Sequence, residues 1–195
     1  PEGFERDPGL VHEFYNQRRS KLLGGIEPNA AHLALARLER EFDGEVTIVT
    51  QNIDDLHERA GSQRLLHMHG ELMKSRCKRC GDVETCREEM GVESVCSCCK
   101  KAGGLRPHVV WFGEIPFHMD RITSLLSRAG LFLSIGTSGL VYPAAGFVMI
   151  ADAAGARTVE INLDESAGTS RFSESRRGPA GELVPQFVEE LLAAG

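Results

Sequence analysis

The chain has 195 residues, of which 42% are hydrophobic and 26% are charged, and its formal net charge is −6. This size suits one domain of ordinary size with a small inserted module, and this composition excludes a disordered chain. The acidic balance disfavours nucleic acid as a partner, because nucleic-acid-binding proteins present a basic face. No apolar run approaches the roughly 18 residues of a membrane-spanning helix, so we expect no membrane partner.

The N-terminal part of the chain predicts two helices. Asp7 and Pro8 supply a capping carboxylate and a first-turn proline, so a helix should start there and run to the glycines at 24–25. Leu10 and Phe14 fall on neighbouring faces with Arg18 or Leu22, so we expect this helix to be amphipathic. A second helix should follow Asn29 and extend through residues 30–42.

Strand-like and helix-like segments then alternate, which predicts an α/β protein with a Rossmann-like, mostly parallel sheet. The expected strands are residues 46–49, 64–68, 108–112, 131–135 and 157–163, and the expected helices are 54–60, 119–128, 143–153 and 185–192. We divide the chain into a helical element of a small domain (1–27), two Rossmann parts (28–72 and 107–195) and an inserted zinc-binding module (73–106).

The six cysteines are bunched between residues 77 and 99, whereas a disulfide framework would scatter them. Two C-x2-C pairs separated by fifteen residues have the spacing of a four-thiolate zinc site, formed by Cys77, Cys80, Cys96 and Cys99. A closed shell of four sulfur ligands leaves no open position, so we expect one structural zinc ion in a reducing, cytoplasmic compartment. The alternatives are buried thiols without metal, or Cys98 in place of a neighbouring ligand.

Amide and carboxylate side chains follow the strand expected at 46–49, namely Gln51, Asn52 and Asp54. In open α/β sheets ligands bind outside the carboxyl ends of the strands, and these groups suit a ribose or a carboxamide. The same residues could instead cap the short helix at 54–60, and position alone does not decide between the two.

His67 and His69 share one face of the next expected strand, because side chains two residues apart on a strand point the same way. A histidine beside this polar group can serve as a general base, since its proton affinity lies near neutral pH. It can equally be a structural residue, and these observations do not choose between the two histidines.

A glycine-rich turn at Gly136, Thr137, Ser138 and Gly139 follows one expected strand and precedes an expected helix. Backbone N–H groups, two hydroxyls and a helix N-terminus predict a cradle for a phosphate or a ribose. Asn162 ends the next strand and should reach the same edge, unless it is only a turn residue.

Six segments occur in an order that resembles the sirtuins, a family of NAD-dependent protein-lysine deacylases. They are TQNID (50–54), HMHGE (67–71), the paired cysteine knuckles, RPHVVWFGE (106–114), GTSGLVYPAAGF (136–147) and EINLD (160–164). The resemblance is greatest to the bacterial CobB-type, or class III, branch, which includes the mitochondrial desuccinylases.

The resemblance implies roles for the matching residues. His69, directly before a glycine, would be the catalytic base, with Asn52 and Asp54 as further catalytic residues. The implied NAD contacts are Gln51, Asn52, Ile53, Asp54, Gly136, Thr137, Ser138, Asn162, Leu163, Asp164 and Ala180. The implied substrate contacts are Val109, Trp111, Phe112, Gly113, Glu114, Val141 and Tyr142, on two strands that would clamp an acylated-lysine peptide through backbone hydrogen bonds.

The implied reaction begins when the acyl oxygen of the substrate attacks the nicotinamide ribose and nicotinamide leaves. His69 then removes a proton from a ribose hydroxyl. The products would be nicotinamide, lysine and O-acyl-ADP-ribose.

Tyr15 and Arg18 lie three residues apart, hence on one face of the first helix, and class III sirtuins carry Tyr-x-x-Arg at this place. A phenol hydroxyl and a guanidinium fork suit a terminal carboxylate, so the resemblance implies succinyl-, malonyl- or glutaryl-lysine as substrates besides acetyl-lysine. The alternative is a solvated helix face, which the neighbouring Arg19 and Lys21 make reasonable.

The family's glycine-rich NAD turn, and the strand that carries it, are not found in these 195 residues. We therefore expect an N-terminally shortened form of a longer protein in which NAD binding is weakened. Separately, we expect a monomer. Two other interpretations stay open: an acetyl-preferring deacetylase or ADP-ribosyltransferase on the same scaffold, or a zinc module without enzymatic activity.

Overall fold

The computed structural model describes residues 1–194, which form two compact units. Unit 1 contains residues 1–27, 48–59 and 65–117, and unit 2 contains residues 28–47, 60–64 and those from 118 onward. Each unit combines helices with a sheet, which confirms the α/β prediction. Among the described residues no helix is both long enough and apolar enough to cross a membrane.

Unit 1 begins with a short helix α1 (Glu2–Arg6) and the long helix α2 (Pro8–Leu23). The start of α2 is as predicted, because the Asp7 carboxylate accepts a hydrogen bond of 2.9 Å from the Leu10 N–H. The predicted buried face is wrong, since the side chains of Leu10 and Phe14 are 62% and 49% exposed. The buried residues of α2 are His12, Arg19 and Leu22.

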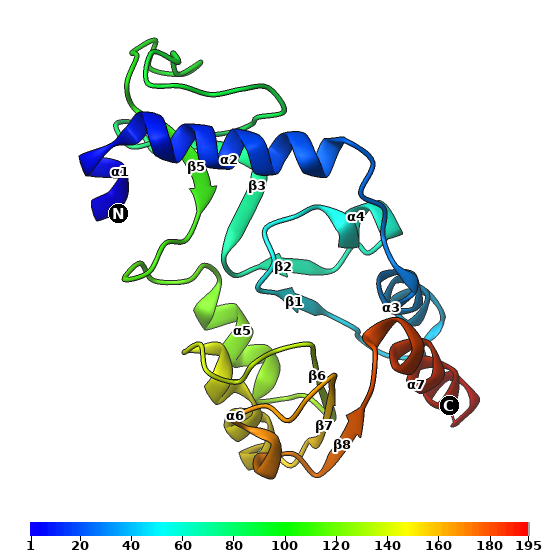
Figure 1. Ribbon diagram of the computed structural model, residues 1–195. Helices are drawn as coiled ribbons and strands as arrows, with labels where there is room; N and C mark the ends of the chain where they lie inside the picture. Colours follow the sequence, from blue (N-terminus) through cyan, green and yellow to red (C-terminus); the bar gives the residue numbers. More distant parts are fainter. Residues whose placement is uncertain (195) are drawn as a thin grey trace. The chain divides into compact units, whose positions relative to one another are not determined.

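The face of α2 that packs inward is chosen by a buried arginine. Arg19 is only 2% exposed, and its guanidinium donates hydrogen bonds to the backbone carbonyls of Leu72 and Glu88. Those acceptors lie far away in the chain, so hydropathy along α2 could not reveal them. Figure 1 shows α2 crossing strands β3 (Gly70–Cys77) and β5 (Leu105–Val109).

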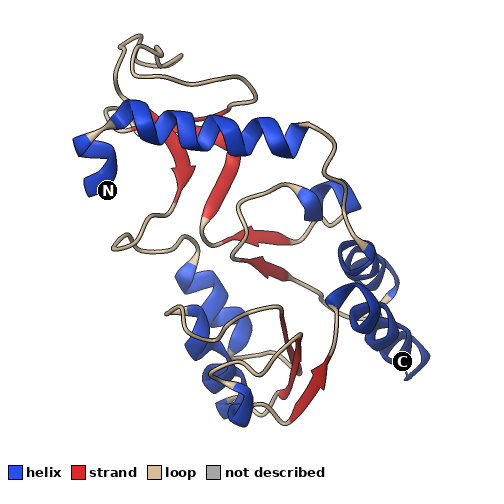
Figure 2. Ribbon diagram, viewed as in Figure 1, coloured by secondary structure: helices blue, strands red, loops and turns tan. Residues whose placement is uncertain are grey.

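Two small sheets complete unit 1 (Figure 2). Strand β1 (Ile48–Thr50) pairs in parallel with β2 (Leu65–His67), and the helix α4 (Leu56–Ala60) lies between them in the chain. Strand β3 is the centre of an antiparallel sheet with the order β4 (Val83–Thr85), β3, β5. Residues 51–54 therefore come directly after the end of β1, and His69 comes just after the end of β2.

The strand expected at 108–112 lies earlier in the chain, as β5. Pro107 pairs with Ser75 beside an irregularity of register between Glu71 and Ser75. Proline donates no hydrogen bond, and a bulge is one of the few places in a sheet that accepts it. The predicted strand starts too late because proline is rarely found inside a strand and Pro107 lies within β5.

Unit 2 holds a parallel sheet with the order β6 (Leu131–Ile135), β7 (Arg157–Asn162), β8 (Glu174–Arg177). Helices α3 (Ala30–Glu41) and α7 (Ala180–Ala194) pack side by side (Figure 1) and cover a core that includes Leu38, Val159 and Phe187. The other helical elements of unit 2 are α5 (Met119–Leu126), η1 (Ala144–Gly146), α6 (Phe147–Ala153) and η2 (Thr169–Arg171). The parallel strands thus form two sheets, β1-β2 and β6-β7-β8, rather than one.

The last helix begins five residues before the expected Pro185. Helix α7 starts at Ala180, and the N–H groups of Glu182 and Leu183 both bond to the carbonyl of Pro179. Pro185 lies inside the helix, where its missing N–H removes one hydrogen bond without ending the element. A proline was therefore a poor marker of this helix start.

Candidate active site

His69 carries its proton on the nitrogen that faces the protein. Its Nδ1 lies 3.1 Å from the backbone carbonyl oxygen of Gln51. A carbonyl only accepts hydrogen bonds, so in the neutral ring Nδ1 is the donor and Nε2 keeps a lone pair. Within residues 1–194 no protein group hydrogen-bonds to Nε2. His69 is therefore held in the tautomer that a general base needs.

In His67, by contrast, both ring nitrogens face oxygen acceptors. Its Nε2 lies 2.7 Å from a carboxylate oxygen of Glu58, and its Nδ1 lies 3.5 Å from the carbonyl oxygen of Asn52. Burial lowers the pKa of His67, but the hydrogen bond and negative charge of Glu58 outweigh burial and raise it above 6.5. With an acceptor at each nitrogen, the ring favours the doubly protonated form and offers no lone pair. The geometry separates two histidines that the sequence pattern could not.

The backbone next to His69 is fixed by a close approach of two strands. The Val110 N–H donates a 2.8 Å hydrogen bond to the His69 carbonyl, and Gly70 pairs with Val109 of β5. Gly70 has φ +84°, and a Cβ placed there would lie 2.1 Å from the His108 carbonyl oxygen. Only glycine permits this contact, which explains why His69 is followed by glycine.

The amide of Asn52 and the carboxylate of Asp54 extend from the loop after β1. The Asn52 backbone N–H bonds to the Thr50 hydroxyl at 3.1 Å, while its side chain is exposed. One Asp54 oxygen accepts a 3.1 Å hydrogen bond from the Leu56 N–H at the start of α4. The helix-cap interpretation thus holds for one oxygen of Asp54, and the second oxygen carries no hydrogen bond within residues 1–194.

Gln51 and Ile53 contribute to the site through their backbone carbonyl groups. The Gln51 carbonyl orients His69, and the Ile53 carbonyl accepts a short 2.6 Å hydrogen bond from the Leu72 N–H. Both bonds tie the loop after β1 to the loop and strand after β2. Asn52, which lies between these two carbonyls in the chain, therefore belongs to a segment held on both sides.

Tyr15 is anchored and Arg18 is not. The Trp111 Nε1–H donates a 2.9 Å hydrogen bond to the Tyr15 hydroxyl, and the Tyr15 ring packs against a buried cluster that includes Leu72. Arg18 is exposed, with its guanidinium carbon 4.5 Å from the centre of the Phe14 ring. Among the described residues no carboxylate lies within 4.0 Å of Arg18. Its charge is available to an outside anion.

The segment after β5 folds into a turn rather than the strand predicted for 109–114. Glu114 accepts hydrogen bonds from Arg106, Arg76 and the Trp111 N–H, and its own N–H bonds back to the Trp111 carbonyl. Burial raises the pKa of Glu114, but the bonds from Arg106 and Trp111 and the two positive charges outweigh burial and lower it to about 2. Phe112, by contrast, is 95% exposed.

The second predicted clamp strand is also a turn. Val141 accepts a hydrogen bond on its carbonyl from the Ala145 N–H, which leads into the 3-10 helix η1. Tyr142 is 68% exposed. Val109 is therefore the only proposed peptide contact that lies within a strand of residues 1–194, and the others lie in loops whose peptide groups an added strand could still pair with.

In unit 2 the glycine-rich turn and Asn162 are brought together. The Asn162 side-chain amide donates a 2.7 Å hydrogen bond to the Thr137 carbonyl, and the Asn162 carbonyl accepts one of 3.0 Å from the Gly178 N–H. Gly136 has φ +61° with open space where a Cβ would stand. This is a cradle that a side chain would fill, and it fits the phosphate or ribose predicted for it.

One part of that prediction is wrong, because no helix begins directly after the turn. Helix α6 starts only at Phe147. The Thr137 and Ser138 hydroxyls instead cap the N–H groups of Gly139 and Leu140, so turn amides rather than a helix dipole form the cradle. The remaining implied cofactor contacts in this unit are Leu163 and Asp164, both exposed, and Ala180 at the start of α7.

The four predicted cysteine ligands converge. The sulfur atoms of Cys77, Cys80, Cys96 and Cys99 all lie within 4.8 Å of one another. Two of the separations are 3.8 Å and 3.6 Å, and a tetrahedron with zinc–sulfur bonds of about 2.3 Å requires about 3.8 Å. Hydrogen bonds from the backbone N–H groups of Cys80 and Arg79 lower the pKa of Cys77 to about 7, which favours the thiolate. Cys98 is exposed and lies outside this cluster.

Two groups around the site, Arg106 and Glu58, were not predicted from the sequence. Arg106 stacks 3.3 Å from the centre of the Trp111 ring and pairs with Glu114; the opposite charges eight residues apart were an available signal. Glu58, whose carboxylate raises the pKa of His67, had no such signal. Its partner comes from a neighbouring strand, and a pattern within α4 does not show it.

Comparisons with a family model and with curated relatives give the same family description. A family model described as the Sir2 family matches residues 1–143. An NAD-dependent protein deacylase of Vibrio cholerae is 56% identical over 195 residues, which is all of this chain and 79% of the relative. A Vibrio vulnificus protein of the same description is 60% identical over 194 residues, covering 99% of this chain and 79% of the relative.

Solved structures agree as well. A mutant Sir2 homologue in complex with ADP ribose has a TM-score of 0.91 at 38% identity, covering all of this chain and 78% of that one. A Sir2 homologue in complex with NAD has a TM-score of 0.90 at 38% identity and 100% and 76% coverage. Sir2Af2 bound to a myristoylated histone peptide has a TM-score of 0.80 at 32% identity, with 99% and 83% coverage.

Proposed function

The chain belongs to the Sir2 family, and from that premise we propose that this NAD-dependent protein deacylase acts on lysine carrying succinyl, malonyl or related acidic acyl groups, as well as on acetyl-lysine. One observation carries the acyl preference. Arg18 presents an unpaired, exposed guanidinium one helical turn from a tyrosine hydroxyl that Trp111 holds in place. An acidic acyl group ends in a carboxylate that both groups can bind, whereas acetyl ends in a methyl group.

The catalytic base in this proposal is His69. When bound, NAD supplies the ribose carbon that receives the acyl oxygen, with nicotinamide as the leaving group. His69 Nε2 accepts a proton from a ribose hydroxyl, and the Gln51 carbonyl stabilises the imidazolium through Nδ1–H. The exposed amide of Asn52 and the free oxygen of Asp54 orient the nicotinamide and its ribose.

The other proposed contacts follow from the local geometry. The N–H groups of Thr137 and Ser138 bind the phosphates, while Gly136, whose own N–H bonds to the Ile161 carbonyl, leaves the space for them to approach. Asn162 shapes the ribose contact by tying β7 to that turn. The thiolates of Cys77, Cys80, Cys96 and Cys99 bind one structural zinc ion. Six free cysteines suit a reducing cytoplasm.

The test of acyl preference is Arg18→Met in the full-length protein, assayed with NAD and matched succinyl- and acetyl-lysine peptides. A charge-assisted hydrogen bond contributes about 1.5–3 kcal/mol, so kcat/KM for the succinyl peptide should fall roughly 10- to 150-fold. The acetyl peptide should change by less than about threefold. Lys21→Met, which removes another exposed cation from α2, is the control and should leave both values unchanged. Equal losses on both peptides would make Arg18 a structural residue.

The test of the base compares two variants. His69→Ala should abolish deacylation with every acyl peptide while the thermal unfolding temperature stays close to that of the wild type, because His69 makes only one hydrogen bond through its ring. His67→Ala leaves Glu58 without its partner, so it should lower the unfolding temperature more than it lowers kcat. Retained deacylation in His69→Ala would remove this residue from the mechanism.

A further inference from the structure

Helix α2 carries the two acyl-selecting side chains on one face and a second pair of polar residues beside it. Successive residues of an α-helix are rotated by about 100°, so Asn16 and Arg19 form a face next to that of Tyr15 and Arg18. Asn16 and Arg19 point to the zinc module. No role in the reaction described above involves either of them.

Asn16 is clamped to the zinc module at two points. Its side-chain amide donates a 2.9 Å hydrogen bond to the Met90 carbonyl, and its side-chain oxygen accepts one of 3.0 Å from the Met90 N–H. This arrangement imitates the pairing between two strands. Met90 is 3% exposed and packs in the same buried cluster as Cys77 and Cys96, so the clamp ends directly on the metal site.

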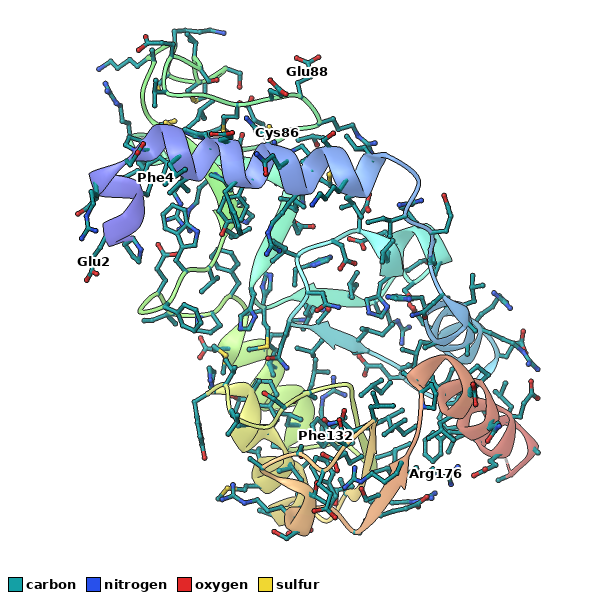
Figure 3. The ribbon with its side chains drawn as sticks, in the orientation of Figure 1. Glu2, Phe4, Cys86, Glu88, Phe132 and Arg176 are labelled. Atoms are coloured by element: carbon teal, nitrogen blue, oxygen red, sulfur yellow. The ribbon has the colours of Figure 1, made fainter. Side chains whose placement is uncertain are left out.

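Arg19 extends the connection to the catalytic loop. Its guanidinium donates to the Asn16 side-chain oxygen at 2.8 Å, to the Glu88 carbonyl at 3.2 Å and to the Leu72 carbonyl at 3.3 Å. The Leu72 N–H in turn bonds to the carbonyl of Ile53, which lies between Asn52 and Asp54. Figure 3 labels Cys86 and Glu88 on the segment of the zinc module that passes α2.

Leu22 of α2 packs against Met73 at the start of the module, but the bonds of Asn16 and Arg19 are what join the helix to residues 88–90, beside a groove. The groove has a volume of about 760 Å³ and lies between α2 and residues 89–92. Its α2 side includes Glu13, Gln17 and Lys21, which are exposed and cannot transmit packing. The position of α2 relative to residues 88–90 of the module therefore depends on the polar contacts of Asn16 and Arg19.

We infer that Asn16 and Arg19 are positioning residues through which the zinc module sets the location of Tyr15 and Arg18, and hence the selectivity for acidic acyl groups. The inference rests on the proposed acyl preference. It assigns the metal a part in substrate choice, although no step of the reaction involves the ion. Loss of the clamp should raise KM for acidic substrates and leave acetyl-lysine, which needs no contact from α2, nearly unaffected.

The test is Asn16→Ala, with Gln17→Ala as the matched control, since Gln17 is exposed on the same helix and its side chain bonds, within residues 1–194, to Glu13 alone. In Asn16→Ala the KM for the succinyl peptide should rise about tenfold with kcat retained, and the KM for the acetyl peptide should stay within about twofold. Gln17→Ala should match the wild type on both peptides. Equal changes on both peptides, or none, would overturn the inference.

A second readout does not depend on substrate. Trp111 is the only tryptophan in the chain and donates its N–H to Tyr15, so its fluorescence reports the position of α2. Its emission should move to longer wavelength in Asn16→Ala, and in the same direction when a chelator removes zinc from the wild-type protein. Unchanged emission in both cases would overturn the coupling. A wild-type protein that does not favour succinyl-lysine, yet shows these shifts, would contradict the proposed acyl preference alone.

Discussion

Replacing Gly70 by alanine should damage both stability and catalysis, because two backbones meet at this residue. An added Cβ would lie 2.1 Å from the His108 carbonyl oxygen and 2.8 Å from the Val109 Cα. An ordinary carbon–oxygen contact needs at least about 3.3 Å, so β5 must retreat by about 1 Å. That movement breaks the 2.8 Å hydrogen bond from Val110 to the carbonyl of His69.

The loss of stability in Gly70→Ala is the sum of two contributions. A side chain at φ +84° costs about 1–2 kcal/mol, and a buried backbone group left without its partner costs about 1–3 kcal/mol. The free energy of unfolding should therefore fall by roughly 2–5 kcal/mol, which lowers Tm by roughly 4–20 °C for a chain of this length. A shift of about 1 Å at the base should also reduce kcat about 100-fold.

Gly61→Ala is the control for the backbone conformation alone. Gly61 has φ +103° but open space around its Cβ position. Calorimetry on the two variants should show a loss of only about 1–2 kcal/mol for Gly61→Ala and no loss of deacylation. If Gly70→Ala unfolds at the same temperature as Gly61→Ala, the strand contact is not rigid, and the explanation for the glycine after the base fails.

Three further predictions concern charge and metal. The folded pKa of Glu114, about 2, lies below its ordinary 4.5, so the ionised carboxylate contributes its full stability above pH 4.5 and loses it as pH falls toward 2. In Glu114→Gln, urea unfolding should not show this loss of stability at acid pH. The pKa of His67 is raised, so its pH dependence is the opposite: its contribution to stability is complete below pH 6.5 and is lost as pH rises through the folded pKa. Glu58→Gln should lower the pKa of His67 in an NMR titration. An unchanged pKa would contradict the pairing of His67 with Glu58. Cys80→Ser should lose the bound zinc, whereas Cys98→Ser should keep one ion per chain by metal analysis; a metal-free Cys98→Ser protein would show that the ligand set is wrong.

Much of the fold and of the metal site could be predicted from the sequence because the relevant signals are local. Asp7 and Pro8 start α2 through contacts within one turn, and the start of β6 follows from a short apolar run. The spacing of the cysteine pairs predicted a four-sulfur site, since each pair lies on one tight turn. The order of the family segments predicted His69 as the base.

The tertiary structure decided what depends on partners far away in the chain. His67 and His69 look alike on one strand, and only Glu58 and the carbonyls of Asn52 and Gln51 favour the protonated form of His67 and leave a lone pair on Nε2 of neutral His69. Hydropathy favoured burial of Leu10 and Phe14 and left Arg19 to solvent, yet carbonyl acceptors from β3 and the zinc module bury the arginine. Propensity and spacing act over a few residues, whereas protonation and burial depend on which backbone groups folding brings alongside.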